Sequence, residues 1–265
     1  MSFETVRRGA LEYLTSSLID APHGFSTRYG GVSKGSLSSL NLGAHRGDNP
    51  QNVVKNYEIL GKSLGFSPED TVFTKQLHGG IVARVGKSDR GVGLLRPVEQ
   101  ERDGLVTNEP GVVLTIFMAD CTPILLYDPV ARCVGGAHAG WRGTACGIAA
   151  NAVETMARDF GSDPKNIRAA IGPAIGRCCF ETDRDVPDAM RAALGPDAEE
   201  AVDGAGPKYH VDLKALNAIW LRRSGVEIID LCSDCTACQP DRFWSHRVTG
   251  GNRGSLAAVI RLPDS

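Results

Sequence analysis

The spacing of apolar residues predicts four amphipathic helices along the chain. In each of them, apolar positions recur every three or four residues, as expected when one face of a helix packs on a core. The four predicted helices are Pro50–Leu64, Thr144–Phe160, Asp185–Leu194 and Asp212–Arg223. Gly161 and Gly225 stand where two of these helices should end, which is typical of a helix C-terminus.

Short apolar runs predict buried strands between and around these helices. The runs are Thr71–Thr74, Ile81–Val85, Gly111–Met118, Pro123–Tyr127, Arg132–Gly136, Ile167–Ile171, Val226–Leu231 and Leu256–Leu262. Strands and helices do not alternate strictly, so the order favours an α+β fold of mixed α/β layers, with mixed sheets and flanking helices. No charged linker or change in composition divides the chain, and we expect a single domain over residues 1–265.

Composition and charge narrow the possible functions. Hydrophobic residues make up 42% and charged residues 23% of the chain, and the formal net charge is −2. Proteins that bind nucleic acid by neutralising phosphates usually carry a basic excess, so we expect no nucleic-acid partner. The best apolar run, Val112–Ala119, is too short to cross a bilayer, and Met1–Tyr13 lacks the apolar stretch of a signal peptide. We therefore expect a cytoplasmic protein with no membrane association.

Three residues of metal-binding type follow predicted buried strands. His78, Cys121 and His138 each lie beside glycine or other small residues. Imidazole and thiolate are ligands that zinc favours, and three protein ligands with one open position are typical of a catalytic site. Asp120 could support the metal or accept a proton. The three residues are far apart in sequence, so spacing alone equally fits structural histidines and a core cysteine.

Candidate ligand-binding residues lie in glycine-rich segments. Arg142 precedes the predicted helix that begins near Thr144, where a guanidinium group and helix amides would form an anion site. Alternatively, Arg142 is a solvated charge on the surface. Arg28 and Asn41 could bind a phosphate or hydroxyl group of a substrate. They could equally satisfy the backbone of their own turns.

A second group of cysteines has the spacing of a metal site. Cys232, Cys235 and Cys238 form two overlapping Cys-x-x-Cys steps, and His246 could complete a set of four ligands. Because no second Cys-x-x-Cys pair lies nearby, the sequence favours a tight turn with small buried thiols. Cys178 and Cys179 are adjacent, so we expect them to be poorly placed to chelate together and to be structural.

Seven motifs, in this order, resemble those of the laccase-domain family, also called polyphenol oxidase-type or peptidoglycan-editing-factor proteins. They are Ser26–Ser33 with Ser39–Gly43, Gln76–Gly79, Ala119–Pro123, His138–Gly143, Ile171–Gly176, Cys235–Cys238 and Phe243–Arg247. The resemblance implies a cytotoxic-necrotizing-factor-like fold and the metal ligands His78, Cys121 and His138. Two segments depart from the family pattern, Phe243–Val248 and Thr249–Gly254, which puts the substrate preference in question.

The resemblance implies a zinc-dependent purine nucleoside enzyme. Such an enzyme would cleave adenosine, inosine or methylthioadenosine with phosphate and would also deaminate adenosine, with Cys121, Asp120 and Arg142 at the catalytic centre. Its partners would be small molecules, a purine nucleoside and phosphate. Two histidines and a cysteine also suit copper. However, six histidines in all are too few for a conventional multicopper oxidase.

Two further functions stay open. The protein could be a cysteine- or metal-dependent amidase that edits cell-wall precursors, with Cys121 as nucleophile and His138 as base. A binding module without catalytic activity would leave three ligands around an open position unexplained.

Overall fold

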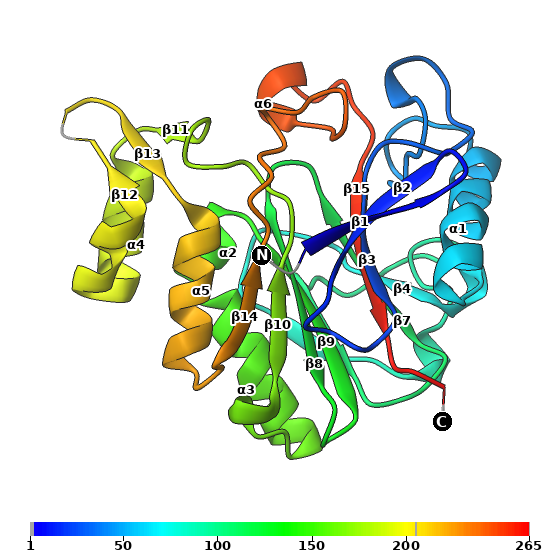
Figure 1. Cartoon of the computed structure of the whole chain (residues 1–265), viewed down its shortest axis with the longest axis horizontal. Helices are drawn as coiled ribbons and strands as arrows, with labels where there is room; N and C mark the ends of the chain where they lie inside the picture. The colour runs from blue at the N-terminus through cyan, green and yellow to red at the C-terminus, as the bar shows by residue number, and fades with distance from the viewer. Residues whose placement is uncertain (1–2, 205, 265) are drawn as a thin grey trace.

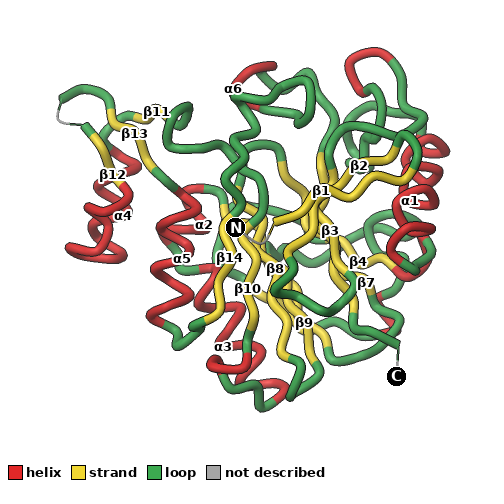
Figure 2. The backbone as a smooth tube through the Cα atoms, in the orientation of Figure 1, coloured by secondary structure: helices red, strands yellow, loops and turns green. Residues whose placement is uncertain are grey.

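Two six-stranded sheets pack face to face at the centre of the computed structural model, which describes residues 3–204 and 206–264 (Figures 1 and 2). The first sheet has the order β1 (Phe3–Arg8), β2 (Leu11–Ser16), β3 (His23–Ser26), β15 (Leu256–Arg261), β7 (Val113–Met118), β4 (Thr71–Phe73). The second has the order β14 (Ile228–Leu231), β10 (Arg168–Ile171), β8 (Thr122–Asp128), β9 (Cys133–Ala139), β6 (Gly104–Thr107), β5 (Val82–Arg84). Both sheets combine parallel and antiparallel pairs, which confirms the predicted mixed fold class.

Helices cover the outer faces of the two sheets. Helix α1 (Pro50–Leu64) packs on the first sheet, and α3 (Ile148–Phe160) and α5 (Leu213–Arg223) pack on the second (Figure 1). A small lobe beside α5 contains α4 (Asp185–Leu194) and a third sheet of order β11 (Glu181–Thr182), β13 (Tyr209–Val211), β12 (Val202–Asp203). Two short helices, α2 (Trp141–Ala145) and α6 (His246–Thr249), complete the set.

Strand β8 shows how the sequence pattern builds these layers. Side chains alternate between the two faces of a strand. Leu125 and Tyr127 enter the core between the sheets, whereas Ile124 and Leu126 enter the core shared with α3. Both faces of the strand are therefore buried, which explains its continuous apolar sequence.

Two predicted boundaries were wrong in ways that affect the site. The single helix expected over Thr144–Phe160 is two helices, α2 and α3, because Gly147 has a φ of 69° between them and interrupts the helical backbone. The strand expected to end at Gly136 continues to Ala139, where it pairs with β8. His138 therefore lies inside β9, not after it.

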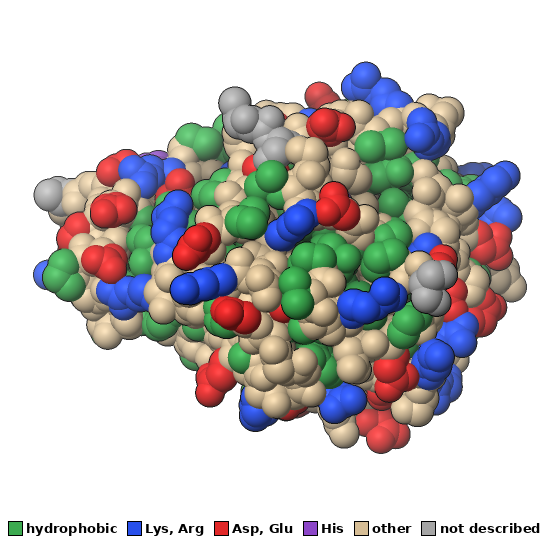
Figure 3. Space-filling model, turned by 60° about the horizontal axis from the view of Figure 1, so that its bottom comes forward, with side chains coloured by type: hydrophobic (Ala, Val, Ile, Leu, Met, Phe, Trp, Pro, Cys, Tyr) green, Lys and Arg blue, Asp and Glu red, His purple; other side chains and the backbone are tan. Residues whose placement is uncertain are grey.

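Figure 3 shows one face of the molecule. Basic and acidic side chains are interspersed among apolar ones on the face in Figure 3. Among the described residues, no helix is long and apolar enough to cross a membrane.

Candidate metal centre and active site

The three predicted metal ligands meet where the chain passes between the two sheets. His78 lies in the connection from β4 to β5, and Cys121 lies in the connection from β7 to β8. Their ligand atoms and that of His138 all lie within 4.8 Å of one another. The backbone turns sharply here, since His78 has a φ of 62° and Asp120 a φ of 84°. Such values are uncommon for residues with a side chain and concentrate at functional sites.

The space around the three ligands fits a metal ion. The rings of His78 and His138 have centroids 4.8 Å apart and planes at 74°. A Cβ atom at Gly140 would lie 2.5 Å from Nδ1 of His78 and 3.2 Å from Sγ of Cys121. Only glycine at position 140 leaves room for this arrangement. Two imidazoles and one thiolate around an open side match the donor set of a catalytic zinc site.

Asp103, which the sequence reading missed, organises this group. Its buried carboxylate accepts a hydrogen bond from Nδ1 of His138 at 2.9 Å, which leaves Nε2 of that ring available to a metal. The same carboxylate accepts three backbone N–H groups, from Leu77 at 3.1 Å, His78 at 3.0 Å and Gly79 at 2.8 Å. Burial opposes ionisation, but these hydrogen bonds hold the pKa of Asp103 below its usual value.

The Cys121 thiol and the His138 imidazole stabilise each other's charged forms. Burial raises the pKa of Cys121, but His138 and His78 outweigh it and lower this pKa to about 6. Burial likewise opposes charge on His138, but Cys121 and Asp103 raise its pKa to about 9. At neutral pH the metal-free group is therefore a thiolate–imidazolium pair. A metal cation can take the place of the imidazolium proton.

Asp120 lies beside this group, but its carboxylate is engaged elsewhere. It accepts hydrogen bonds from Oγ1 of Thr236 at 2.6 Å, Oγ of Ser245 at 3.0 Å and the backbone N–H of Arg247 at 2.7 Å. Its own carbonyl accepts the N–H of Ile175 at 2.9 Å. The carboxylate contacts tie the turn that carries Cys121 to the segment between β14 and β15, and the carbonyl contact ties it to the segment between β10 and β11.

The metal-ligand group opens into a cavity of about 660 Å³ with a basic wall. Four arginines line it, namely Arg46, Arg142, Arg247 and Arg253. Arg253 is largely buried, and its Nε has no hydrogen-bond partner among the described residues. Burial and the nearby Arg46 lower the pKa of Arg253 to about 10, so it remains charged at neutral pH. Sequence reasoning missed Arg46 and Arg253 because neither lies next to a metal motif.

The other predicted ligand-binding residues have different surroundings. Arg142 lies in the cavity wall with its guanidinium group 4.1 Å from the centroid of the Trp141 ring. Arg28 donates to the carbonyls of Ser38 and Pro240, and buried Asn41 bonds to Gly43, Asp48 and Ser255. Neither Arg28 nor Asn41 is among the cavity-lining residues. Both fasten loops.

The cysteines outside this centre group differently from the expectation. Cys232 is buried in the core between the sheets, and burial raises its pKa to about 11. The prediction that Cys178 and Cys179 are poorly placed to chelate together was wrong, because their Sγ atoms lie within 4.8 Å of each other and of those of Cys235 and Cys238. The turn that begins at Gly176, whose carbonyl accepts the N–H groups of Cys179 and Phe180, makes this possible.

Comparison with known proteins decides the family. The sequence profile of a family described as multi-copper polyphenol oxidoreductase laccase matches residues 22–263. The chain belongs to this laccase family. The expected resemblance is thereby confirmed.

Members of the laccase family resemble this chain over almost its whole length. Purine nucleoside phosphorylase YlmD of Geobacillus stearothermophilus is 40% identical, covering 97% of this chain and 96% of the relative. Purine nucleoside phosphorylase YlmD of Bacillus subtilis is 38% identical, covering 91% and 88%. The crystal structure of the YfiH protein of Bacillus licheniformis has a TM-score of 0.92 and 37% identity, covering 97% of this chain and 98% of that one. These names support an enzyme.

Proposed function

We propose that this protein is a purine nucleoside phosphorylase that holds zinc between His78, Cys121 and His138. The observation that carries the proposal is one cavity lined both by two of the three metal ligands, His78 and Cys121, and by four arginine side chains, with the third ligand, His138, buried within 4.8 Å of the other two. Phosphorolysis needs both an activated nucleoside and a bound phosphate. This cavity offers groups for each.

The phosphate site that we propose is formed by Arg46 and Arg253. In phosphorolysis the glycosidic C–N bond breaks, and a phosphate oxygen forms a new bond to the anomeric carbon. Phosphate carries up to two negative charges at neutral pH, and guanidinium groups match its oxygens in charge and geometry. The unpartnered Nε of Arg253 is a buried donor that a phosphate oxygen would satisfy.

The nucleoside would lie between the metal ligands and the aromatic part of the wall. Trp141 and Phe180 offer flat apolar surfaces for a purine ring, and Arg142 is stacked on Trp141 at the same wall. When bound, zinc would supply a Lewis acid that polarises a substrate oxygen or water. Cys121 holds its negative charge near that position, and Asp120 keeps the Cys121 turn attached to the segment carrying Ser245 and Arg247. Copper is the alternative metal.

Two other reactions use the same residues and need separate tests. Adenosine deamination would require the open metal position but no phosphate. The thiolate–imidazolium pair of Cys121 and His138 also favours, as a second candidate, a cysteine amidase acting on cell-wall precursors. In that reaction, Cys121 would be a nucleophile and not a metal ligand.

Incubating the purified protein with adenosine, inosine and methylthioadenosine, with and without phosphate, separates these possibilities. The proposal predicts free base and ribose 1-phosphate (or its methylthio analogue) only when phosphate is present, together with protein-bound zinc. Inosine formed from adenosine without phosphate would show deamination. No turnover of any nucleoside by zinc-loaded protein would refute the proposal, and hydrolysis of a cell-wall peptide amide, abolished by thiol alkylation after metal removal, would favour the amidase.

A further inference from the structure

Four cysteines outside the active site form a second group with metal-binding geometry. Cys178 and Cys179 lie between β10 and β11, and Cys235 and Cys238 follow β14. Their four Sγ atoms all lie within 4.8 Å of one another. Sγ of Cys238 lies 3.5 Å from that of Cys178 and 3.4 Å from that of Cys179. Segments some sixty residues apart thus bring four thiols to one point.

The separations suit a single tetrahedral ion. Zinc–thiolate bonds of about 2.3 Å place the sulfurs of a regular ZnS₄ tetrahedron about 3.8 Å apart. The separations of 3.5 and 3.4 Å from Sγ of Cys238 lie close to this value, and all the separations are at most 4.8 Å. In a four-iron cluster each cysteine binds a different iron, so the sulfurs would lie farther apart. The thiols are therefore spaced for one metal ion and not for a cluster.

The backbone around Cys235 is shaped to support a thiolate. The N–H of Gly176 points to Sγ of Cys235 at 3.1 Å, a contact that stabilises negative charge on the sulfur. A Cβ at Gly176 would lie 3.2 Å from Sγ of Cys178 and 3.4 Å from Sγ of Cys235. The turn is thus closely fitted to the sulfur group.

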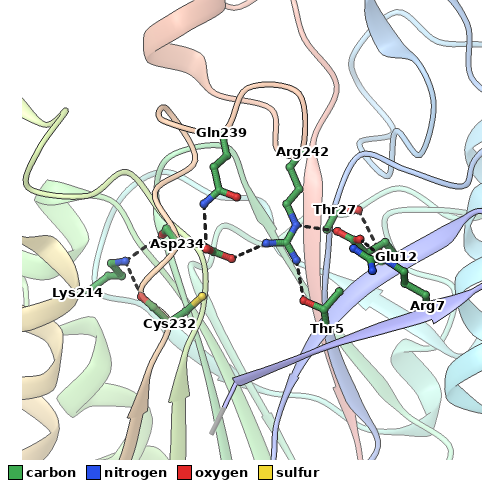
Figure 4. A network of polar contacts seen from close by, with 9 residues as sticks. All are labelled: Thr5, Arg7, Glu12, Thr27, Lys214, Cys232, Asp234, Gln239 and Arg242. Carbon is green, nitrogen blue, oxygen red and sulfur yellow. Dashed lines mark hydrogen bonds and ion pairs between the residues drawn. The ribbon is translucent and has the colours of Figure 1, made fainter. Parts of the chain in front are cut away.

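A polar network holds the second cysteine segment in place without a metal (Figure 4). Nζ of Lys214 donates to the carbonyls of Cys232 at 2.6 Å and Asp234 at 3.1 Å. The Asp234 carboxylate in turn accepts from Nε2 of Gln239 at 2.9 Å and from Arg242 at 2.8 Å. These hydrogen bonds hold the backbone on both sides of the segment between Cys235 and Cys238. Preorganisation of this kind favours metal binding.

The cysteine group also supports the wall of the active-site cavity. Arg247, which lines the cavity, donates to the carbonyls of Cys179 at 2.9 Å and Glu181 at 3.0 Å. Phe180, which also lines the cavity, directly follows Cys179. We propose that Cys178, Cys179, Cys235 and Cys238 bind a structural zinc ion that joins these two segments beside the cavity. A closed set of four thiolates leaves no open position, so this zinc takes no part in the reaction.

Metal analysis of the full-length protein tests this proposal independently of any enzymatic activity. The protein, purified under reducing conditions and loaded with zinc, should hold about two zinc ions per chain, one at each group. The double variant Cys178→Ser/Cys238→Ser should hold about one, and Cys121→Ser should also hold about one. Cys146→Ser removes an exposed thiol outside both groups and should keep the wild-type content. A double variant that retains the wild-type zinc content would overturn the proposal.

A second measurement needs no variant of the cysteine group, in case the double variant does not fold. Cobalt loaded into Cys121→Ser should give the charge-transfer absorption of a tetrahedral cobalt–thiolate centre. A thiol reagent should react more slowly with Cys178 and Cys238 when zinc is present than after chelation, as mass spectrometry of labelled peptides would show. Absence of the cobalt–thiolate absorption, unchanged reactivity of these thiols, or iron in place of zinc would each contradict the proposal.

Discussion

The two thiol-containing groups of this protein are built in different ways. The group of His78, Cys121 and His138 lies where the chain crosses between the two sheets, and Asp103 fixes it from behind. The group of Cys178, Cys179, Cys235 and Cys238 lies on loops, and two of its cysteines are exposed. The first has three ligands and faces a basic cavity. The second has four thiols, and none of them is among the residues that line this cavity.

The number and kind of ligands therefore determine what each group can do. An open coordination position gives a substrate access to a metal, whereas four thiolates exclude it. In the first group the carboxylate of Asp103 also fixes the orientation of the His138 ring. We therefore expect perturbation of the first group to abolish activity and perturbation of the second to alter only metal content and the cavity wall.

Gly140→Ala should give the largest difference in effect between the two groups. The new Cβ would lie 2.5 Å from Nδ1 of His78, so the ring must move and the three-ligand site should lose its zinc and its activity. Zinc content should fall from about two to about one per chain, with the four-cysteine zinc retained. The control is Gly79→Ala, whose Cβ would lie an ordinary 3.7 Å from Asp103. Full activity and zinc in Gly140→Ala would contradict the assigned geometry.

Acidification should release the zinc of the two groups to different extents. Between the Cys121 pKa of about 6 and the His138 pKa of about 9, Cys121 is a thiolate and His138 carries a proton that zinc must displace. In this pH range, zinc affinity at the three-ligand site should fall about tenfold for each pH unit of acidification. Burial and neighbouring thiols raise the pKa of Cys178 and Cys179, so zinc must displace at least two protons there.

The four-cysteine site should therefore lose zinc affinity by at least about a hundredfold for each pH unit of acidification. Chelator competition at about pH 6.5 and 7.5 checks this, using Cys121→Ser to isolate the four-cysteine site and Cys178→Ser/Cys238→Ser to isolate the other. An equal dependence of zinc affinity on pH at the two sites would show that zinc displaces the same number of protons from both groups.

Asp103→Asn should weaken only the three-ligand group. The amide keeps the size of the side chain but removes the negative charge that orients His138, and zinc affinity should fall by roughly 10- to 100-fold. Activity should recover at high zinc concentration if folding is intact. Asp163→Asn, at an exposed helix cap far from both groups in sequence, serves as the matched control. An unchanged zinc affinity in Asp103→Asn would show that Asp103 does not support the three-ligand site.

Arg253→Gln should have a smaller and more specific effect. Loss of a charged hydrogen bond worth ~1.5 kcal/mol should raise KM for phosphate about tenfold, with little change in kcat at saturating phosphate. Both zinc ions should remain bound. Arg184→Gln, which alters an exposed arginine on the lobe, should leave KM unchanged. A fall in kcat with no change in KM would place the phosphate site elsewhere.

The sequence predicted local features well and spatial convergence less well. The bounds of α1 and α4 agree with the prediction because their apolar spacing is regular and Pro50 and Gly195 mark ends of the two helices. The predicted ligands His78, Cys121 and His138 do come together. Strand β1 was missed because it is a largely exposed edge strand with charged residues and so lacks an apolar run. Strand β2 was missed although it is mostly buried, because polar residues interrupt its apolar positions.

The missed site residues depend on contacts that no local pattern encodes. Asp103 precedes the short strand β6, which was not predicted, and its partners lie about 25 and 35 residues away. Arg46 and Arg253 reach the cavity from opposite ends of the chain. The pairing of Cys178 and Cys179 with Cys235 and Cys238 required the turn at Gly176, and adjacency in sequence suggested the opposite.

The rate at which Cys121→Ser releases hypoxanthine from inosine in the presence of phosphate tests the central claim most directly. Serine removes the thiolate ligand with little change in size, and Cys146→Ser controls for loss of a thiol elsewhere. Cys121→Ser should lose the zinc of the three-ligand site, and its rate should fall by more than roughly 100-fold, the largest loss expected for a residue that only supports a ligand. Phosphorolysis at the wild-type rate by Cys121→Ser lacking that zinc would contradict the central claim.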